Sequence, residues 1–119
     1  MNLDTISLID LGEKLRELAH KCYEADKAYI KADEEFNILD DNRKSYLATL
    51  TDAQEGKSTA EKERAALQTP EWAVWLEGFQ AARMRSRIAR VERDNAIRLW
   101  KSCEDIIFIK NKEWNREKN

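Results

Sequence analysis

The chain has 119 residues, of which 42% are hydrophobic and 37% charged, and its formal net charge is −2. This length suits one domain, and the apolar share excludes an intrinsically disordered chain. The net charge disfavours bulk attraction of the whole molecule to nucleic acid or anionic lipid. Only three glycines and one proline occur, which favours long helices over a many-stranded sheet with tight turns.

The first fifteen residues lack both a basic segment and an uninterrupted apolar stretch. We therefore expect no secretory signal, and no segment is apolar and long enough to predict a membrane span. The two cysteines, Cys22 and Cys103, are too few to stabilise a secreted mini-protein of this size. These features predict a cytoplasmic protein with reduced thiols and no membrane contact.

A heptad pattern of apolar residues predicts one long helix over about residues 8–54. The spacing alternates between four and three, as in a coiled coil, and Arg43 is the one charged interruption. The positions of this first seam are Leu11, Leu15, Leu18, Cys22, Ala25, Tyr29, Ala32, Phe36, Leu39, Arg43, Tyr46 and Leu50.

The connection that follows carries helix start and stop signals. Gly56 is typical of the left-handed residue that follows a helix. Ser58 and Glu61 have the spacing of a capping box, which predicts a short helix over about residues 59–68.

A second long helix is predicted over about residues 70–114. Thr69 is a preferred N-cap, and Pro70 suits the first helical position because its missing N–H needs no partner there. Its own seam consists of Trp75, Phe79, Ala82, Ser86, Ala89, Arg93, Ala96, Trp100, Cys103, Ile107, Lys110 and Trp114.

We expect residues 1–119 to form one all-α domain in which the long helices make an antiparallel hairpin. The register that we predict places large side chains opposite small ones, because facing layers then fill space without voids. The resulting pairs include Tyr46 with Phe79, Phe36 with Ala89, Ala32 with Arg93, and Cys22 with Cys103.

Charge supports the same orientation. Residues 24–41 contain seven acids and two lysines, a net of −5, whereas residues 84–101 contain six basic residues and two acids, a net of +4. Opposite blocks that lie side by side favour antiparallel alignment.

The second long helix carries a further apolar stripe, here called the outer stripe, about 200° around the helix from its seam. A helix that is apolar on two sides is buried on both, and a two-helix hairpin has no third layer to close its core. We therefore predict a homodimer with a four-helix arrangement, in which a buried Asn sets the register; docking onto a different protein is the alternative. The predicted interface consists of Met84, Ile88, Val91, Asn95, Leu99, Ile106 and Ile109, with Ala81 at its start.

Three arginines lie on one helical face at i, i+4 and i+7: Arg83, Arg87 and Arg90. We expect them to pair with the acids of residues 33–41, because that block neutralises the segment. The alternative is that they contact phosphate, which would make the chain a nucleic-acid-binding accessory factor for recombination or replication.

No pattern in the sequence predicts catalysis, a metal or a cofactor. Glu17 and His20 form an E-x-x-H motif, but Leu18 occupies the seam and turns both outward, so a solvated face is expected. The triplet G-K-S in "EGKST" lacks the upstream glycine of a P-loop and follows a helix. We expect a non-enzymatic protein.

The stretch "KSYLATL…EGKSTAEKERAAL…EWAVWLEGFQAAR…ARVER", within residues 44–93, resembles small helical proteins from early and recombination regions of tailed-phage genomes. The resemblance covers under half of the chain and implies no catalytic residues. It implies a phage or mobile-element accessory protein that works through protein partners.

Overall fold

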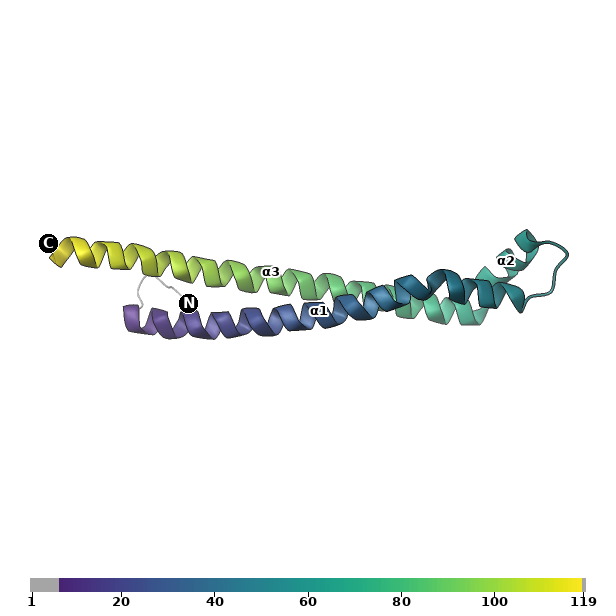
Figure 1. The fold of residues 1–119 in the computed structure, drawn as a ribbon, viewed down its shortest axis with the longest axis horizontal. Coiled ribbons are helices and arrows are strands. Elements are labelled where there is room, and N and C mark those ends of the chain that lie inside the picture. The colour runs from purple at the N-terminus through teal and green to yellow at the C-terminus, as the bar shows by residue number, and fades with distance from the viewer. Residues whose placement is uncertain (1–6, 119) are drawn as a thin grey trace. The chain divides into compact units, whose positions relative to one another are not determined.

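The computed structural model describes residues 7–118, and within them it contains three helices and no strand. They are α1 (Leu8–Asp52), α2 (Thr59–Leu67) and α3 (Pro70–Lys118), labelled in Figure 1. The predicted all-α class is confirmed. The first two helices end slightly earlier than expected, and α3 continues beyond the expected residue 114.

The chain divides into two compact units. Unit 1 comprises Met1–Tyr29 and Ala89–Asn119, and unit 2 comprises Ile30–Ile88. Each unit contains a stretch of α1 and a stretch of α3, and unit 2 also contains α2.

The core of unit 1 is a small cluster of Leu11, Leu18 and Cys103, all fully or almost fully buried. The Cys103 thiol donates a hydrogen bond to the Leu11 carbonyl, with the sulfur 3.6 Å from the oxygen. Four partly buried hydrophobic side chains pack around this cluster: Leu15, Trp100, Ile106 and Ile107.

The core of unit 2 is largely aromatic. The rings of Phe36 on α1 and Phe79 on α3 lie 5.3 Å apart, measured between centroids. Tyr46 stacks on Trp75 at 5.8 Å, and Trp75 stacks in turn on Trp72 at 5.0 Å. Such ring pairs stabilise a fold beyond the area they bury, by about 0.5–1.5 kcal/mol each.

Burial follows both predicted seams. Every position of the first seam is buried or half-buried except Arg43, which is exposed as its charge requires. The second seam is buried or half-buried from Trp75 to Lys110, and only Trp114 at its end is exposed.

The predicted register, by contrast, is wrong. Within unit 2, the predicted partner of Phe79 was Tyr46, but the Phe79 ring lies against Phe36, while Tyr46 stacks on Trp72 and Trp75. Sliding one helix by a heptad keeps the same seam residues facing the partner, so the pattern alone does not select the register. Stacking among the aromatic rings replaces the expected match of large against small side chains.

Unit 1 also departs from the predicted register. Cys103 packs against Leu11 and Leu18, and Cys22 lies outside that cluster as a half-buried free thiol. The partner predicted for Arg93 was Ala32, but its guanidinium lies over the ring of Tyr29.

At the end of α1 a side chain supplies a hydrogen bond to a backbone carbonyl. The Gln54 amide donates to the Leu50 carbonyl at 3.0 Å, which occupies one of the acceptors left open at a helix end. Gly56 was expected in the left-handed region, but among the described residues no glycine has a positive φ. A Cβ at Gly56 would lie 3.2 Å from the Lys62 Cγ, so close approach to α2 is what favours glycine there.

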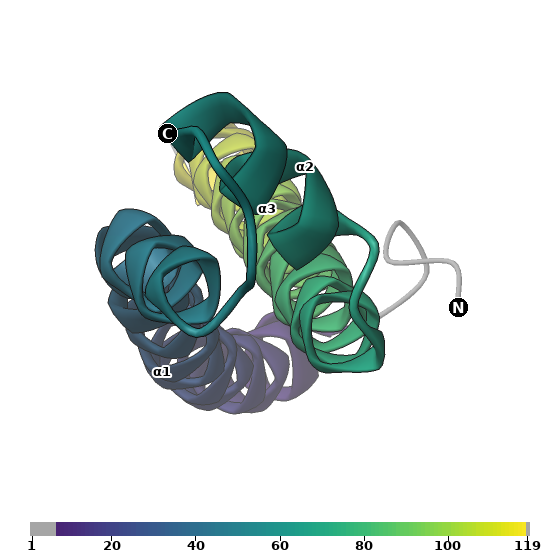
Figure 2. The same ribbon diagram turned by 90° about the vertical axis from the view of Figure 1, so that its right-hand side faces the viewer.

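The predicted caps of the other two helices are confirmed. The Ser58 hydroxyl accepts from the Glu61 N–H at 3.2 Å, and the Glu61 carboxylate accepts from the Lys57 N–H at 3.0 Å. The Thr69 hydroxyl accepts from the Trp72 N–H at 3.2 Å, just before Pro70. In the view of Figure 2 this connection is nearest to the reader, and the segment that runs from the end of α1 into α2 is visible.

No helix in the described part of the chain is both long enough and apolar enough to cross a membrane.

Candidate functional site

The outer stripe of α3 is exposed to solvent in the single chain. In unit 2, Met84 and Ile88 are 54% and 49% exposed. In unit 1, Val91, Leu99 and Ile109 are 57%, 54% and 55% exposed. Scattered exposed apolar residues are ordinary, but a periodic set on one helix face marks an interaction surface.

Two members of the predicted interface already have partners within their own chain. Asn95 is exposed, and its side-chain oxygen accepts from the Arg98 guanidinium at 3.5 Å. Ile106 is half-buried because it packs against the cluster of Leu11, Leu18 and Cys103. A seam with a period of 3.5 residues drifts around a helix of 3.6 residues per turn, so toward its C-terminal end it approaches Ile106.

A shallow pocket of about 250 Å³ interrupts this surface near the C-terminal end of α3. Its lining consists of Ile106, Ile109, Lys110 and Glu113, all from α3.

The arginine face of α3 is free of carboxylates. Arg83, Arg87 and Arg90 are exposed, and within the described range none lies within 4.0 Å of an acidic oxygen. Within unit 2, Arg83 and Arg87 thus make none of the ion pairs expected with the acids of residues 33–41, whereas the pairing expected for Arg90 would join the two units and stays a prediction. Asp33 in that block instead accepts from the Ser86 hydroxyl at 3.1 Å and the Asn37 amide at 3.3 Å.

Arg93 is held within unit 1. Its guanidinium lies 4.3 Å from the centroid of the Tyr29 ring, 4.0 Å from the Asp26 carboxylate and 3.2 Å from the Asp94 carboxylate. Its charge is thus committed to the pairing of α1 with α3.

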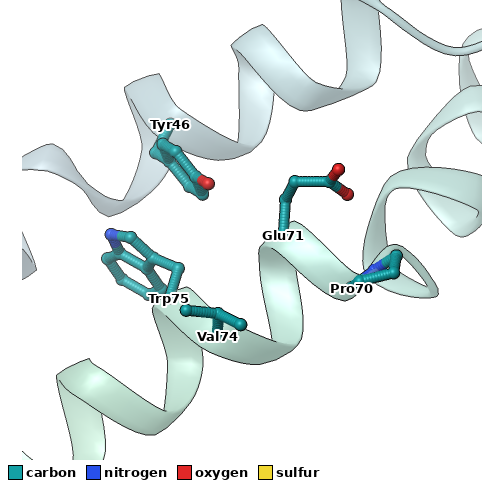
Figure 3. Close-up of a pocket in the computed structure, with 5 residues that line it drawn as sticks. All are labelled: Tyr46, Pro70, Glu71, Val74 and Trp75. Carbon is teal, nitrogen blue, oxygen red and sulfur yellow. The ribbon is translucent and has the colours of Figure 1, made fainter.

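A pocket in unit 2, shown in Figure 3, was not identified from the sequence. It has a volume of about 440 Å³ and is lined by Tyr46 of α1 and by Pro70, Glu71, Val74 and Trp75 from the first turns of α3. The signal in the sequence was the cluster of aromatic residues Trp72, Trp75 and Phe79, of which only the last two belong to the seam.

The titratable side chains form no metal site. Among the described residues no group of three or more His, Cys, Asp or Glu side chains is placed to hold an ion. Glu17 pairs with Lys14 at 3.5 Å and Lys21 at 3.7 Å, and His20 lies 3.9 Å from Glu24. The E-x-x-H motif therefore lies among surface charges.

The Cys103 thiol is the one group in the described range whose pKa is clearly shifted. Burial raises its pKa, and the nearby positive charge of Lys14 lowers it to a smaller extent. A buried, protonated thiol is a poor nucleophile and acts as a small apolar side chain.

No protein-family model matches the chain, and no match is found among curated proteins or solved structures. The surfaces described above are therefore interpreted from their own chemistry.

Proposed function

We propose that the chain is a non-enzymatic helical interaction module that acts as a homodimer through the outer stripe of α3. The observation that carries the proposal is the exposure of Met84, Ile88, Val91, Leu99 and Ile109 at helical spacing on a single face. Their burial would remove the largest periodic apolar surface of α3 from water.

The proposal includes the arrangement of the dimer. Within each chain α1 and α3 would form one antiparallel hairpin, and two α3 helices would meet at the centre of a four-helix arrangement. The contacts within each unit support the antiparallel pairing, since Tyr46 late in α1 contacts Trp72 early in α3, whereas Leu11 early in α1 contacts Cys103 late in α3. Self-association is the commonest way in which such a face is covered in soluble proteins.

The apolar area of the outer stripe contributes free energy on the scale that dimer formation requires. Complete burial of one Val, Leu, Ile or Met side chain contributes about 1.5–3 kcal/mol. These side chains are roughly half exposed in the single chain, so each loses about half of that contribution when it stays in water. Five such positions on each of two chains sum to about 7.5–15 kcal/mol, which is of the same order as the ~4–15 kcal/mol that association costs.

A matched pair of substitutions tests the proposal. Ile88→Glu places a charge within the outer stripe, whereas Ile30→Glu makes the same change at a similarly exposed isoleucine of α1 in the same unit. Dilution series followed by light scattering should show that Ile88→Glu raises the dissociation constant of the dimer at least ~10-fold, which corresponds to ~1.4 kcal/mol. Equal effects of the two variants, or none, would reject the outer stripe as the interface.

A second function has its own supporting observation. Among residues 7–118 no acidic oxygen lies within 4.0 Å of Arg83, Arg87 or Arg90, which leaves these three charges available for phosphate. On this alternative the chain is an accessory factor that binds nucleic acid during recombination or replication. In a gel shift titrated with salt, Arg87→Glu should weaken binding strongly and reduce the salt dependence, because phosphate contacts release counterions. Absence of binding at low salt rejects the alternative.

The cellular setting follows from the sequence and stays a prediction. The phage or mobile-element origin rests on the resemblance within residues 44–93, and the cytoplasmic location rests on the two cysteines, which form no disulfide with each other. Both are compatible with an accessory protein that works through a partner surface.

A further inference from the structure

The pocket of unit 2 combines apolar surface with one negative charge. Val74 is 70% exposed, Tyr46 and Trp75 are half-buried, and Glu71 is the only ionisable carboxylate in the lining (Figure 3). No lysine, arginine or histidine lines the pocket. The volume of about 440 Å³ lies within the ~300–1,000 Å³ typical of ligand pockets.

The Glu71 carboxylate is available to a ligand. Among residues 7–118 no cationic side chain lies within 4.0 Å of it. In the view of Figure 3 the Glu71 side chain lies between those of Tyr46 and Pro70, and its carboxylate extends to the side away from Trp75. An anion at the rim of an apolar, aromatic recess disfavours anionic ligands and favours a cation that carries alkyl groups.

The same aromatic cluster already accepts a cation elsewhere. The Arg43 guanidinium lies 5.8 Å from the centroid of the Phe79 ring, and Phe79 stacks on Trp75 at 5.2 Å. Aromatic rings attract cations through the negative potential of their faces, and quaternary ammonium groups are recognised in this way. At the Tyr46 and Trp75 end of the cluster the lining supplies no cation of its own.

We propose that the pocket formed by Tyr46, Glu71, Val74 and Trp75 binds an alkylammonium group. The methyl groups of such a ligand would contact the two rings and Val74, and its positive charge would lie beside the Glu71 carboxylate. This site is separate from the outer stripe, so its test does not depend on the homodimer.

The test compares choline with 3,3-dimethylbutan-1-ol, a neutral molecule of nearly the same shape. Titrations are followed by the indole N–H signals of Trp72 and Trp75, with those of Trp100 and Trp114 as internal controls. Choline should shift the first two signals with saturation, and the neutral isostere should bind at least ~10-fold more weakly, because it lacks the charge. Equal binding of the two molecules, or shifts confined to Trp100 and Trp114, would overturn the proposal.

Two variants identify the groups involved. Glu71→Gln removes the charge at an exposed position and should weaken choline binding at least ~3-fold, whereas Glu77→Gln, an equally exposed change further along α3, should leave it unchanged. Loss of choline binding in Glu77→Gln but not in Glu71→Gln would place the cation elsewhere. Binding retained in both variants would show that the carboxylate plays no part.

A peptide with one trimethyllysine distinguishes the source of the group. Saturation by the peptide at lower concentration than choline, and not by its unmethylated form, assigns the site to a modified protein side chain. The reverse order assigns it to a small molecule. A peptide and choline that both fail to shift Trp72 and Trp75 would reject the site.

Discussion

The guanidinium of Arg93 lies over the ring of Tyr29, 4.3 Å from its centroid, although Arg93 occupies a position of the apolar seam. The side chain is only 26% exposed, and its charge is also met by Asp26 and Asp94. A charge in a seam costs free energy unless it is paired. Here the ring and two carboxylates offset that cost and fix the partner of α3 within unit 1.

We expect Arg93→Gln to lower the free energy of unfolding by about 1–2 kcal/mol, since a cation–π contact and two partly exposed ion pairs are lost. Arg87→Gln serves as the control, because Arg87 is exposed and has no acidic neighbour among the described residues. Urea denaturation followed by circular dichroism measures both. Equal stabilities of the two variants would show that the Tyr29 contact contributes nothing.

The aromatic cluster of unit 2 predicts a large difference between two phenylalanines of α3. Phe79→Ala empties a buried site and should cost about 3–5 kcal/mol. Phe108→Ala makes the same change at a ring that is 63% exposed and lies 5.6 Å, measured from its centroid, from the Lys112 ammonium. Its cost should stay below about 1 kcal/mol. Thermal unfolding followed by tryptophan fluorescence measures the stability of both variants. A similar loss of stability in the two would contradict the assignment of Phe79 to the core.

Gly78 offers a stabilising substitution. It lies inside α3, and a Cβ built there would have no heavy atom within 4 Å. Because glycine loses more backbone entropy on folding than alanine, Gly78→Ala should raise the free energy of unfolding by about 0.5–1 kcal/mol. The same change at Gly56 should stabilise less or destabilise, since its Cβ would lie 3.2 Å from Lys62. Chemical denaturation measures the free energy of unfolding of both variants. A Gly78→Ala variant that is less stable than the unmodified chain would contradict the open space around Gly78.

The buried Cys103 thiol predicts a pH dependence. Its pKa is raised in the folded chain, so as the pH rises the thiol of the unfolded chain ionises first and the unfolded state is favoured. The contribution of Cys103 to stability is therefore complete below the ordinary thiol pKa of about 8.5 and is lost as the pH rises through the folded value. Cys103→Ala should abolish this part of the decline above pH ~8.5, measured by urea denaturation across the pH range. A decline of equal slope in both proteins would contradict the assignment.

Thiol reactivity provides a separate check on the same residue. Cys103 should react with a thiol reagent only when the chain unfolds, whereas the half-buried Cys22 should react in the folded protein. Reaction rates of Cys22→Ala and Cys103→Ala with and without urea separate the two thiols. A Cys103 that reacts as fast as Cys22 in the folded state would show that its cluster opens readily.

The helices, their caps and the seam positions could be predicted because each depends on local signals. Thr69 before Pro70 and Ser58 before Glu61 are sufficient to place two helix starts, and a period of 3.5 residues selects the buried face. The register could not be predicted in this way. Phe79 fits opposite either Tyr46 or Phe36 by seam position alone, and within unit 2 its ring lies against Phe36.

The candidate sites likewise include features that one helix determines and features that contacts between helices determine. The exposure of Met84, Ile88, Val91, Leu99 and Ile109 agrees with the periodic outer stripe. The departure of Ile106 depends on the drift of the seam along the helix, and the pocket beside Tyr46 depends on the register. The burial of Ile106 and the pocket beside Tyr46 both depend on which residues contact each other across helices. The apolar pattern of one helix does not contain that information.

Sedimentation equilibrium of the unmodified chain tests the central claim most directly. The account predicts a mass of twice the 14.0 kDa chain at tens of micromolar protein, and a shift toward the single-chain mass for Ile88→Glu but not for Ile30→Glu. A mass of 14.0 kDa for the unmodified chain throughout that range would contradict the homodimer.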